Sequence, residues 1–295
     1  MDFSKLKGKI FFQDKFIPTN KANIHVLNHS LHFASAVFEG IRVYNRKILF
    51  LDDHIERLIF SSKLMKLNCR FKKKKLRNII YKLIKINGIK DGYIRPIIFR
   101  SSHSMSPETL NCKSIIAIAC WKWGNLFKNE KGISLDISKY PKLNKDIYPI
   151  EAKSSGSYQV SVLSRIDSFK KKFDDCLMLD LKKNVAESSA CNVFWSKKNI
   201  IYTPKNHSIL NGVTRKAVLK ICKNNKIKVI EGDFKLSKIL NADTVFLTGT
   251  AAEIQSVRRI KSKNFKINSE LISLLKNKFE LVKSECPNKV SKIKV

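Results

Sequence analysis

No hydrophobic stretch of this sequence is long enough to span a membrane. Lysine or another polar residue interrupts every apolar run well before the roughly 20 residues that a membrane-spanning helix needs. The N-terminal residues also lack the apolar segment of a secretory signal peptide. We therefore expect a soluble, cytoplasmic protein that has no membrane partner.

Paired cysteines are also absent. The chain has seven cysteines, an odd number, and no two of them stand in C-x-x-C spacing. Neither a disulfide framework nor a zinc site is indicated, and a reducing cytoplasm fits this usage. Three histidines, His25, His29 and His32, cluster near the N-terminus. His29 and His32 are three residues apart and could share a helical face, but without a third ligand on that face we expect the histidines to be structural and predict no metal site.

The short motifs of several large enzyme classes are missing. The sequence contains no G-x-x-x-x-G-K-[ST], no G-x-G-x-x-G, no H-E-x-x-H and no G-x-S-x-G. These absences remove the usual support for a P-loop nucleotide site, a dinucleotide site and a metalloprotease.

Acidic residues are scarce, since 24 Asp and Glu stand against 58 Lys and Arg and give a formal charge of +34. Such a charge suggests nucleic acid, because cations that neutralise phosphates release counterions. However, 47 of the basic residues are lysines, and they are spread through every segment together with Asn and Ile. We attribute the charge to compositional drift and expect no specific nucleic-acid partner. A basic nucleic-acid-binding protein without catalysis is the alternative from another class.

The sequence does have enough apolar residues for real cores. Its 295 residues are 43% hydrophobic, which fits one large or two medium domains. Short β-type runs alternate with amphipathic helices, and a polar connector that contains glycine interrupts them. We predict an α+β protein with a small N-terminal domain at 1–124, a linker at 125–132 and a larger C-terminal domain at 133–295. The cleft between two such domains is the expected place for a ligand.

Three local patterns predict particular elements. Residues 9–12 and 15–17 flank a turn and predict a β-hairpin. Apolar residues at helical spacing predict an amphipathic helix from about 76 to 86. A further helix is expected to carry these side chains inward: Tyr158, Val162, Ile166, Phe169 and Phe173.

Six separated motifs occur in one order along the chain. They are Val37-Phe38-Glu39-Gly40-Ile41-Arg42, Tyr93-Ile94-Arg95-Pro96, Ala152-Lys153, Glu187 before Asn192-Val193-Phe194, Gly212-Val213-Thr214-Arg215, and Thr248-Gly249-Thr250-Ala251-Ala252-Glu253-Ile254. The order of these motifs resembles that of the fold-type IV pyridoxal-phosphate enzymes, whose fold is similar to that of D-amino-acid aminotransferase. Within this group the chain most closely resembles the branched-chain amino-acid aminotransferases. The resemblance runs from about residue 11 to 260. It implies a two-domain α+β fold with the cofactor in the interdomain cleft.

The resemblance implies roles around pyridoxal 5'-phosphate. This cofactor needs an amine to hold its aldehyde, an acid at its pyridine nitrogen and donors for its phosphate. By resemblance Lys153 is the Schiff-base lysine and the catalytic base, Glu187 pairs with the pyridine nitrogen, and Tyr158 donates to the phenolic oxygen. The implied phosphate ligands are Arg57, Val213, Thr214 and Thr250. The helix that begins at Val213 would offer free N–H groups to that phosphate.

The resemblance also implies a substrate site. Its residues would be Phe38, Tyr93, Arg95, Trp123, Thr250 and Ala251. The N–H groups of Thr250 and Ala251 would bind the α-carboxylate. Arg95 lies two residues from Tyr93 and therefore on the same strand face, where it would meet the side-chain carboxylate of glutamate. One pocket could in this way accept an apolar and an acidic substrate.

The implied activity is reversible amino transfer between L-leucine, L-isoleucine or L-valine and 2-oxoglutarate through an aldimine with Lys153. Amino acids and 2-oxo acids would be the partners, and the assembly would be a homodimer or a dimer-based hexamer. Three positions depart from the branched-chain pattern: Phe33 and Leu126 stand where tyrosines are common, and Cys191 where a glutamate is common. The alternative on the same fold is therefore a D-amino-acid aminotransferase or an aminodeoxychorismate lyase.

Overall fold

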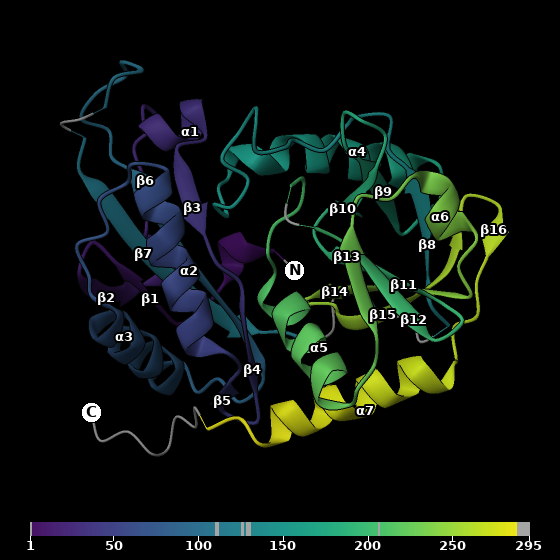
Figure 1. The fold of residues 1–295 in the computed structure, drawn as a ribbon. Helices are drawn as coiled ribbons and strands as arrows, with labels where there is room; N and C mark the ends of the chain where they lie inside the picture. Colours follow the sequence, from purple (N-terminus) through teal and green to yellow (C-terminus); the bar gives the residue numbers. More distant parts are fainter. Residues whose placement is uncertain (1, 110–111, 125–126, 128–130, 206, 288–295) are drawn as a thin grey trace. The chain divides into compact units, whose positions relative to one another are not determined.

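The computed structural model describes residues 2–109, 112–124, 127, 131–205 and 207–287 (Figure 1). The chain forms two compact units. Unit 1 takes its described residues from 2–124, 152–156 and 285–287, and unit 2 takes them from 127–151 and 157–284. The segment 152–156, which contains the predicted Schiff-base lysine, thus belongs with the N-terminal part of the chain.

Unit 1 is built on one sheet. Its described strands are β1 (Lys9–Phe12), β2 (Lys15–Pro18), β3 (Ala36–Phe38), β4 (Ile41–Tyr44), β5 (Lys47–Ile48), β6 (Gly92–Arg100) and β7 (Ser114–Lys122). They pair in the order β2-β1-β7-β6-β4-β5, and β3 also pairs with β6. The helical segments are η1 (Phe3–Lys5), η2 (Thr19–Lys21), α1 (His29–Phe33), α2 (Leu51–Leu64) and α3 (Lys73–Ile86).

Two of the three local predictions fall in unit 1, and both are confirmed. Strands β1 and β2 pair antiparallel, with Phe11 opposite Phe16, as expected for a hairpin. Helix α3 buries the predicted apolar face and begins three residues before the expected start. α3 packs beside α2 and against β1 and β7 (Figure 1). The apolar faces of these two helices and of the sheet form the core of the unit.

Unit 2 contains a larger sheet. Its described strands are β8 (Ile133–Ile137), β9 (Asp175–Leu179), β10 (Val185–Ser188), β11 (Asn192–Lys197), β12 (Ile200–Pro204), β13 (Val229–Gly232), β14 (Thr244–Gly249), β15 (Glu253–Ile260) and β16 (Lys263–Asn264). They pair in the order β10-β9-β8-β15-β14-β11-β12-β13, β16 pairs with β15, and β10 also pairs with β11. The helices are η3 (Gly156–Tyr158), α4 (Gln159–Lys170), α5 (Val213–Asn224), α6 (Leu236–Leu240) and α7 (Glu270–Ser284). Helices and strands mix in both units, so the predicted α+β class is confirmed.

The buried face of α4 is opposite to the one that we predicted to be buried. Val162, Ile166 and Phe169 are about half exposed. The buried face instead carries Ser164 and two further serines, and Ser164 Oγ lies 2.8 Å from Ser138 Oγ, just beyond β8. Small hydroxyl side chains let the helix approach β8 and β9 closely while their polar atoms stay hydrogen-bonded. The apolar period was therefore correct for a helix but wrong for its buried side.

No helix in the described ranges is long and apolar enough to cross a membrane.

Candidate active site

Lys153 is held against strand β3 of unit 1. Its carbonyl accepts from Phe38 N at 3.0 Å, and Ser155 N donates to Ala36 O at 2.8 Å. The Lys153 N–H donates to Ser61 Oγ on α2 at 3.0 Å. The segment 152–156 therefore adds to β3 like a short antiparallel strand, and the backbone of the lysine is fixed on both sides.

A buried ion pair lies next to the end of β3. Glu39 is fully buried, and its Oε1 and Oε2 accept from Arg57 Nε at 2.5 Å and Arg57 Nη2 at 3.0 Å. His54 Nδ1 lies 2.7 Å from Glu39 Oε2. Burial alone would raise the pKa of Glu39, but the charge of Arg57 and the contact with His54 hold it well below its usual range. Burial lowers the pKa of His54, so a neutral His54 donates to the Glu39 carboxylate.

The Phe38 ring lies next to the lysine amine, and Tyr93 and one further cation, Arg95, lie close enough to affect its charge. Lys153 Nζ lies 4.9 Å from the centre of the Phe38 ring, and the Arg95 guanidinium carbon lies 4.8 Å from the same centre. The Tyr93 ring packs edge-on against Trp123 at 4.7 Å. The unit thus brings together all of the site residues that were predicted within it, Phe38, Arg57, Tyr93, Arg95, Trp123 and Lys153.

This environment changes the basicity of the amine. Burial, with the charges of Arg57 and Arg95, lowers the pKa of Lys153 to about 8, although Glu39 acts in the opposite direction. A lysine with this pKa has an appreciable neutral fraction near neutral pH, as a nucleophile or a base requires.

Glu187 on β10 is the centre of a second buried cluster, in unit 2. Its Oε1 lies 2.9 Å from Lys142 Nζ. Its Oε2 accepts from Asn192 Nδ2 at 2.9 Å and from the N–H of Leu210 at 3.3 Å. The half-buried Tyr158 has its ring centre 5.8 Å from Lys142 Nζ. These contacts fix the carboxylate in one orientation.

The start of α5 lies close to this cluster. Val213 and Thr214 are buried, and the N-cap residue Gly212 has no side chain to cap their N–H groups. A Cβ on Gly212 would lie 2.2 Å from Asn192 Oδ1, so the loop can approach Asn192 only with glycine at this place. Helix α5 thus presents its positive end beside the residue that holds Glu187.

The turn that contains Thr250 and Ala251 joins β14 to β15. Thr248 near the end of β14 lies opposite Asn192, which in turn lies opposite Glu187 on β10. These register pairs place the turn at the same end of neighbouring strands as Glu187. The site residues predicted in unit 2 therefore gather at one end of its sheet.

The structure places two of the three unusual positions. Phe33 is half exposed at the end of α1. Cys191 is buried, its Sγ would lie 2.8 Å from a Cβ on Gly249, and burial raises the pKa of its thiol to about 12. A neutral thiol therefore stands at the position where the resemblance led us to note the departure from glutamate. Leu126 lies outside the described residues.

The N-terminal histidines bond to their own chain. His29 Nδ1 lies 2.7 Å from Ser35 Oγ, and its Nε2 lies 3.1 Å from the carbonyl of Ser106. His32 Nε2 lies 3.0 Å from the carbonyl of Val26. Both rings thus have partners within unit 1.

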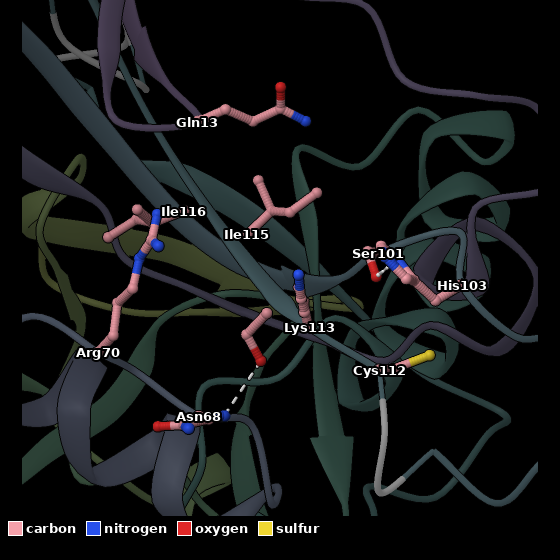
Figure 2. A pocket seen from close by; sticks show the side chains of 10 residues that line it. Gln13, Asn68, Arg70, Ser101, His103, Cys112, Lys113, Ile115 and Ile116 are labelled. Atoms are coloured by element: carbon pink, nitrogen blue, oxygen red, sulfur yellow. Dashed lines mark hydrogen bonds between the residues drawn. The ribbon is translucent and has the colours of Figure 1, made fainter.

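A cavity of about 560 Å³ in unit 1 has a different lining (Figure 2). Figure 2 shows Arg70, Lys113 and His103 around it, and Ser101 Oγ lies 2.7 Å from His103 Nδ1. None of the predicted site residues lines this cavity, so we do not assign the cofactor to it.

Most of the chain is similar to one known family. The model of the family Amino-transferase class IV matches residues 36–260, a span that contains every predicted site residue. The chain belongs to the class IV aminotransferase family. It is therefore an aminotransferase of the pyridoxal-phosphate-dependent type, as the motif order predicted.

Similar proteins carry a more specific name. The probable branched-chain-amino-acid aminotransferase of Rickettsia felis is 35% identical over 88% of this chain and 89% of its own length. The branched-chain-amino-acid aminotransferase of Pseudomonas aeruginosa is 31% identical over 88% and 87%. Among solved structures, the Escherichia coli branched-chain amino acid aminotransferase matches this aminotransferase with a TM-score of 0.92, at 27% identity over 96% and 97% of the two chains. A further branched-chain amino acid aminotransferase, solved in complex with N-(5'-phosphopyridoxyl)-L-glutamate, matches with a TM-score of 0.90, at 29% identity over 97% of each chain.

Sequence analysis did not find three residues of the buried clusters. Glu39 was part of a quoted motif, yet nothing in the sequence indicated that it bonds Arg57. His54 lies three residues before Arg57 on α2, and this helical spacing could have suggested that the two share a face. Lys142 gave no signal, because one lysine among 47 has no distinguishing local pattern.

Proposed function

We propose that this aminotransferase moves the amino group between L-leucine, L-isoleucine or L-valine and 2-oxoglutarate, with pyridoxal 5'-phosphate as its cofactor. The observation that carries this proposal is the Phe38 ring, which has both the Lys153 amine and the Arg95 guanidinium within 5 Å of its centre. The apolar Phe38 ring suits a branched aliphatic side chain, and the Arg95 guanidinium beside this ring suits the distal carboxylate of glutamate. The names of the relatives support a branched-chain amino acid as the amino donor.

The residues present fit this cofactor. The first N–H groups of α5, which have no side-chain cap, suit a phosphate, and the Arg57 guanidinium is a second donor. The Glu187 carboxylate suits a protonated ring nitrogen. When bound, pyridoxal phosphate supplies an aldehyde that captures amines and a ring that accepts electrons.

The side chains would then divide the work as follows. Lys153 Nζ would hold the cofactor until the substrate amine displaces it. The freed amine would then take the proton from the substrate α-carbon and deliver it to the cofactor carbon that had carried the aldehyde, for which its lowered pKa suits it. Glu187 remains an anion at the ring nitrogen. The N–H groups of Thr250 and Ala251 bind the α-carboxylate, and Arg95 binds the second carboxylate of glutamate or 2-oxoglutarate. Tyr158 donates to the phenolic oxygen of the cofactor.

The visible absorbance spectrum of the purified protein tests this proposal. We expect a yellow protein whose band shifts to shorter wavelength when L-leucine is added without an acceptor. A yellow protein that responds to D-alanine or to aminodeoxychorismate but not to L-leucine would contradict the substrate assignment. A protein that stays colourless after pyridoxal phosphate is added would refute the cofactor assignment and leave the basic nucleic-acid-binding alternative.

The role of Lys153 has its own test. Lys153→Ala should abolish both the visible band and the transamination. Lys145→Ala is the matched control, because Lys145 is an exposed lysine eight residues earlier. Retained turnover in the Lys153 variant would contradict the assignment.

Assembly and location remain part of the proposal. We propose a homodimer, alone or as the unit of a hexamer, in the cytoplasm. Sedimentation equilibrium of the purified protein would measure the assembly, and a monomer at micromolar concentration would contradict it.

A further inference from the structure

Lys142 is a buried cation that the proposed chemistry does not yet use. Only 7% of its surface is exposed. Its Nζ contacts Glu187 Oε1 at 2.9 Å and donates to Ser161 Oγ on α4 at 3.2 Å. A lysine is rarely buried unless it is paired, so this position has a specific partner, and that partner is Glu187.

The Glu187 carboxylate has donors at both oxygens. Lys142 contacts Oε1, while Asn192 Nδ2 and the Leu210 N–H donate to Oε2. Of these donors only Lys142 carries a charge. Asn192 and Leu210 therefore orient the carboxylate, and Lys142 in addition compensates its charge.

The charge state of the pair follows from its surroundings. Burial alone would lower the pKa of Lys142, but the Glu187 charge, with a smaller effect of Tyr158, raises it above the ordinary lysine value. Lys142 is thus an ammonium at neutral pH. Without this ammonium the carboxylate would be a buried anion with two neutral donors, and a buried anion without a cation tends to take up a proton.

We infer that Lys142 is a positioning residue that keeps Glu187 ionised, so that the proton between Glu187 and the cofactor stays on the ring nitrogen. This inference rests on the proposed function, in which Glu187 meets that nitrogen. The Lys142 ammonium contacts the Glu187 carboxylate directly, whereas the protonated ring nitrogen would bind the same carboxylate from elsewhere. Because Coulomb energy falls with distance, Lys142 stabilises the carboxylate anion more than it repels the protonated ring nitrogen.

The test uses the holoenzyme loaded with pyridoxal phosphate that carries ¹⁵N in its ring. The ¹⁵N NMR shift reports whether the ring nitrogen is protonated, independently of turnover. Lys142→Met removes the charge and Lys142→Arg keeps it. Lys139→Met is the matched control, because the exposed Lys139 pairs with Asp167 instead.

We expect the protonated signal in the wild type, in Lys142→Arg and in Lys139→Met. In Lys142→Met the signal should move toward the unprotonated position, and kcat should fall about tenfold for each unit by which the ring-nitrogen pKa drops below the assay pH. If Lys142→Met does not fold, Lys142→Gln, which keeps a neutral donor, gives the same readout.

An unchanged ¹⁵N signal in the uncharged variant would overturn the inference and leave the proposed function intact. A signal that moves toward greater protonation would also overturn it, since Lys142 would then compete with the ring nitrogen for Glu187. A wild-type protein that binds no pyridoxal phosphate would overturn the proposed function and this inference together.

Discussion

Replacing Lys153 by methionine should stabilise the cofactor-free protein at neutral pH. The folded protein holds the pKa of this amine at about 8, against an ordinary value of 10.5. Each pKa unit corresponds to about 1.36 kcal/mol, so folding an ammonium into this place costs about 3 kcal/mol. The methionine side chain is uncharged, so the variant avoids this cost, but it lacks the amine that the proposed function needs.

The stability penalty from the Lys153 ammonium depends on pH, and its direction follows from the two pKa values. Below pH 8 both the folded and the unfolded chain carry the proton, so the full penalty applies. Between about 8 and 10.5 the unfolded state binds more protons than the folded state, and stability of the wild type therefore rises with pH. At pH 10 about 1 kcal/mol of the penalty remains, which follows from the same two pKa values.

Urea unfolding at pH 7 and pH 10 measures this difference. Methionine also changes packing, but packing hardly depends on pH, so the advantage of Lys153→Met should shrink by about 2 kcal/mol between the two pH values. Lys145→Met should show no such change, because Lys145 is exposed. An advantage that is absent at pH 7, or the same at both pH values, would refute the view that the fold strains this amine.

Three further substitutions test neighbouring contacts. Arg95→Met should raise KM for 2-oxoglutarate by roughly tenfold or more, the value of one charged hydrogen bond, and leave KM for leucine nearly unchanged; equal effects on both substrates would contradict its role. Gly40→Ala places a Cβ 1.7 Å from the Tyr93 hydroxyl and should cost about 1–3 kcal/mol of stability, whereas Gly124→Ala, with nothing within 4 Å, should leave Tm unchanged. Glu39→Gln removes a negative charge that raises the pKa of the Lys153 amine, so this pKa should fall further, as the pH dependence of cofactor capture would show.

Local patterns predicted local structure well. The β1–β2 hairpin and helix α3 depend on residues within a few positions of one another, and the sequence therefore contains their whole signal. Each family motif is likewise a short stretch of neighbouring residues, so the order of the motifs along the chain was enough to predict the family. In α4, however, the apolar period was compatible with burial of either face, and the packing of Ser164 against Ser138 decided between them.

Long-range contacts could not be predicted in this way. The bond between Phe38 N and Lys153 O joins residues that are far apart in the chain, and the linear domain boundary assigned them to different domains. The Lys142–Glu187 pair has the same character, since neither residue has a neighbour in sequence that identifies its partner. The motifs thus allowed candidate site residues to be proposed, whereas the buried partners that set the charge states of Lys153 and Glu187 had no signal in the sequence.

The return of residues 152–156 to unit 1 limits how this protein can be recombined with its relatives. A chimera that joins a foreign N-terminal half at the predicted linker would carry Lys153 without its own Ala36, Phe38 and Ser61. The backbone of the lysine would then rest on a foreign strand and helix. A crossover that preserves activity must therefore inherit β3, α2 and residues 152–156 from one parent, although more than a hundred residues of sequence separate the first of these segments from the last.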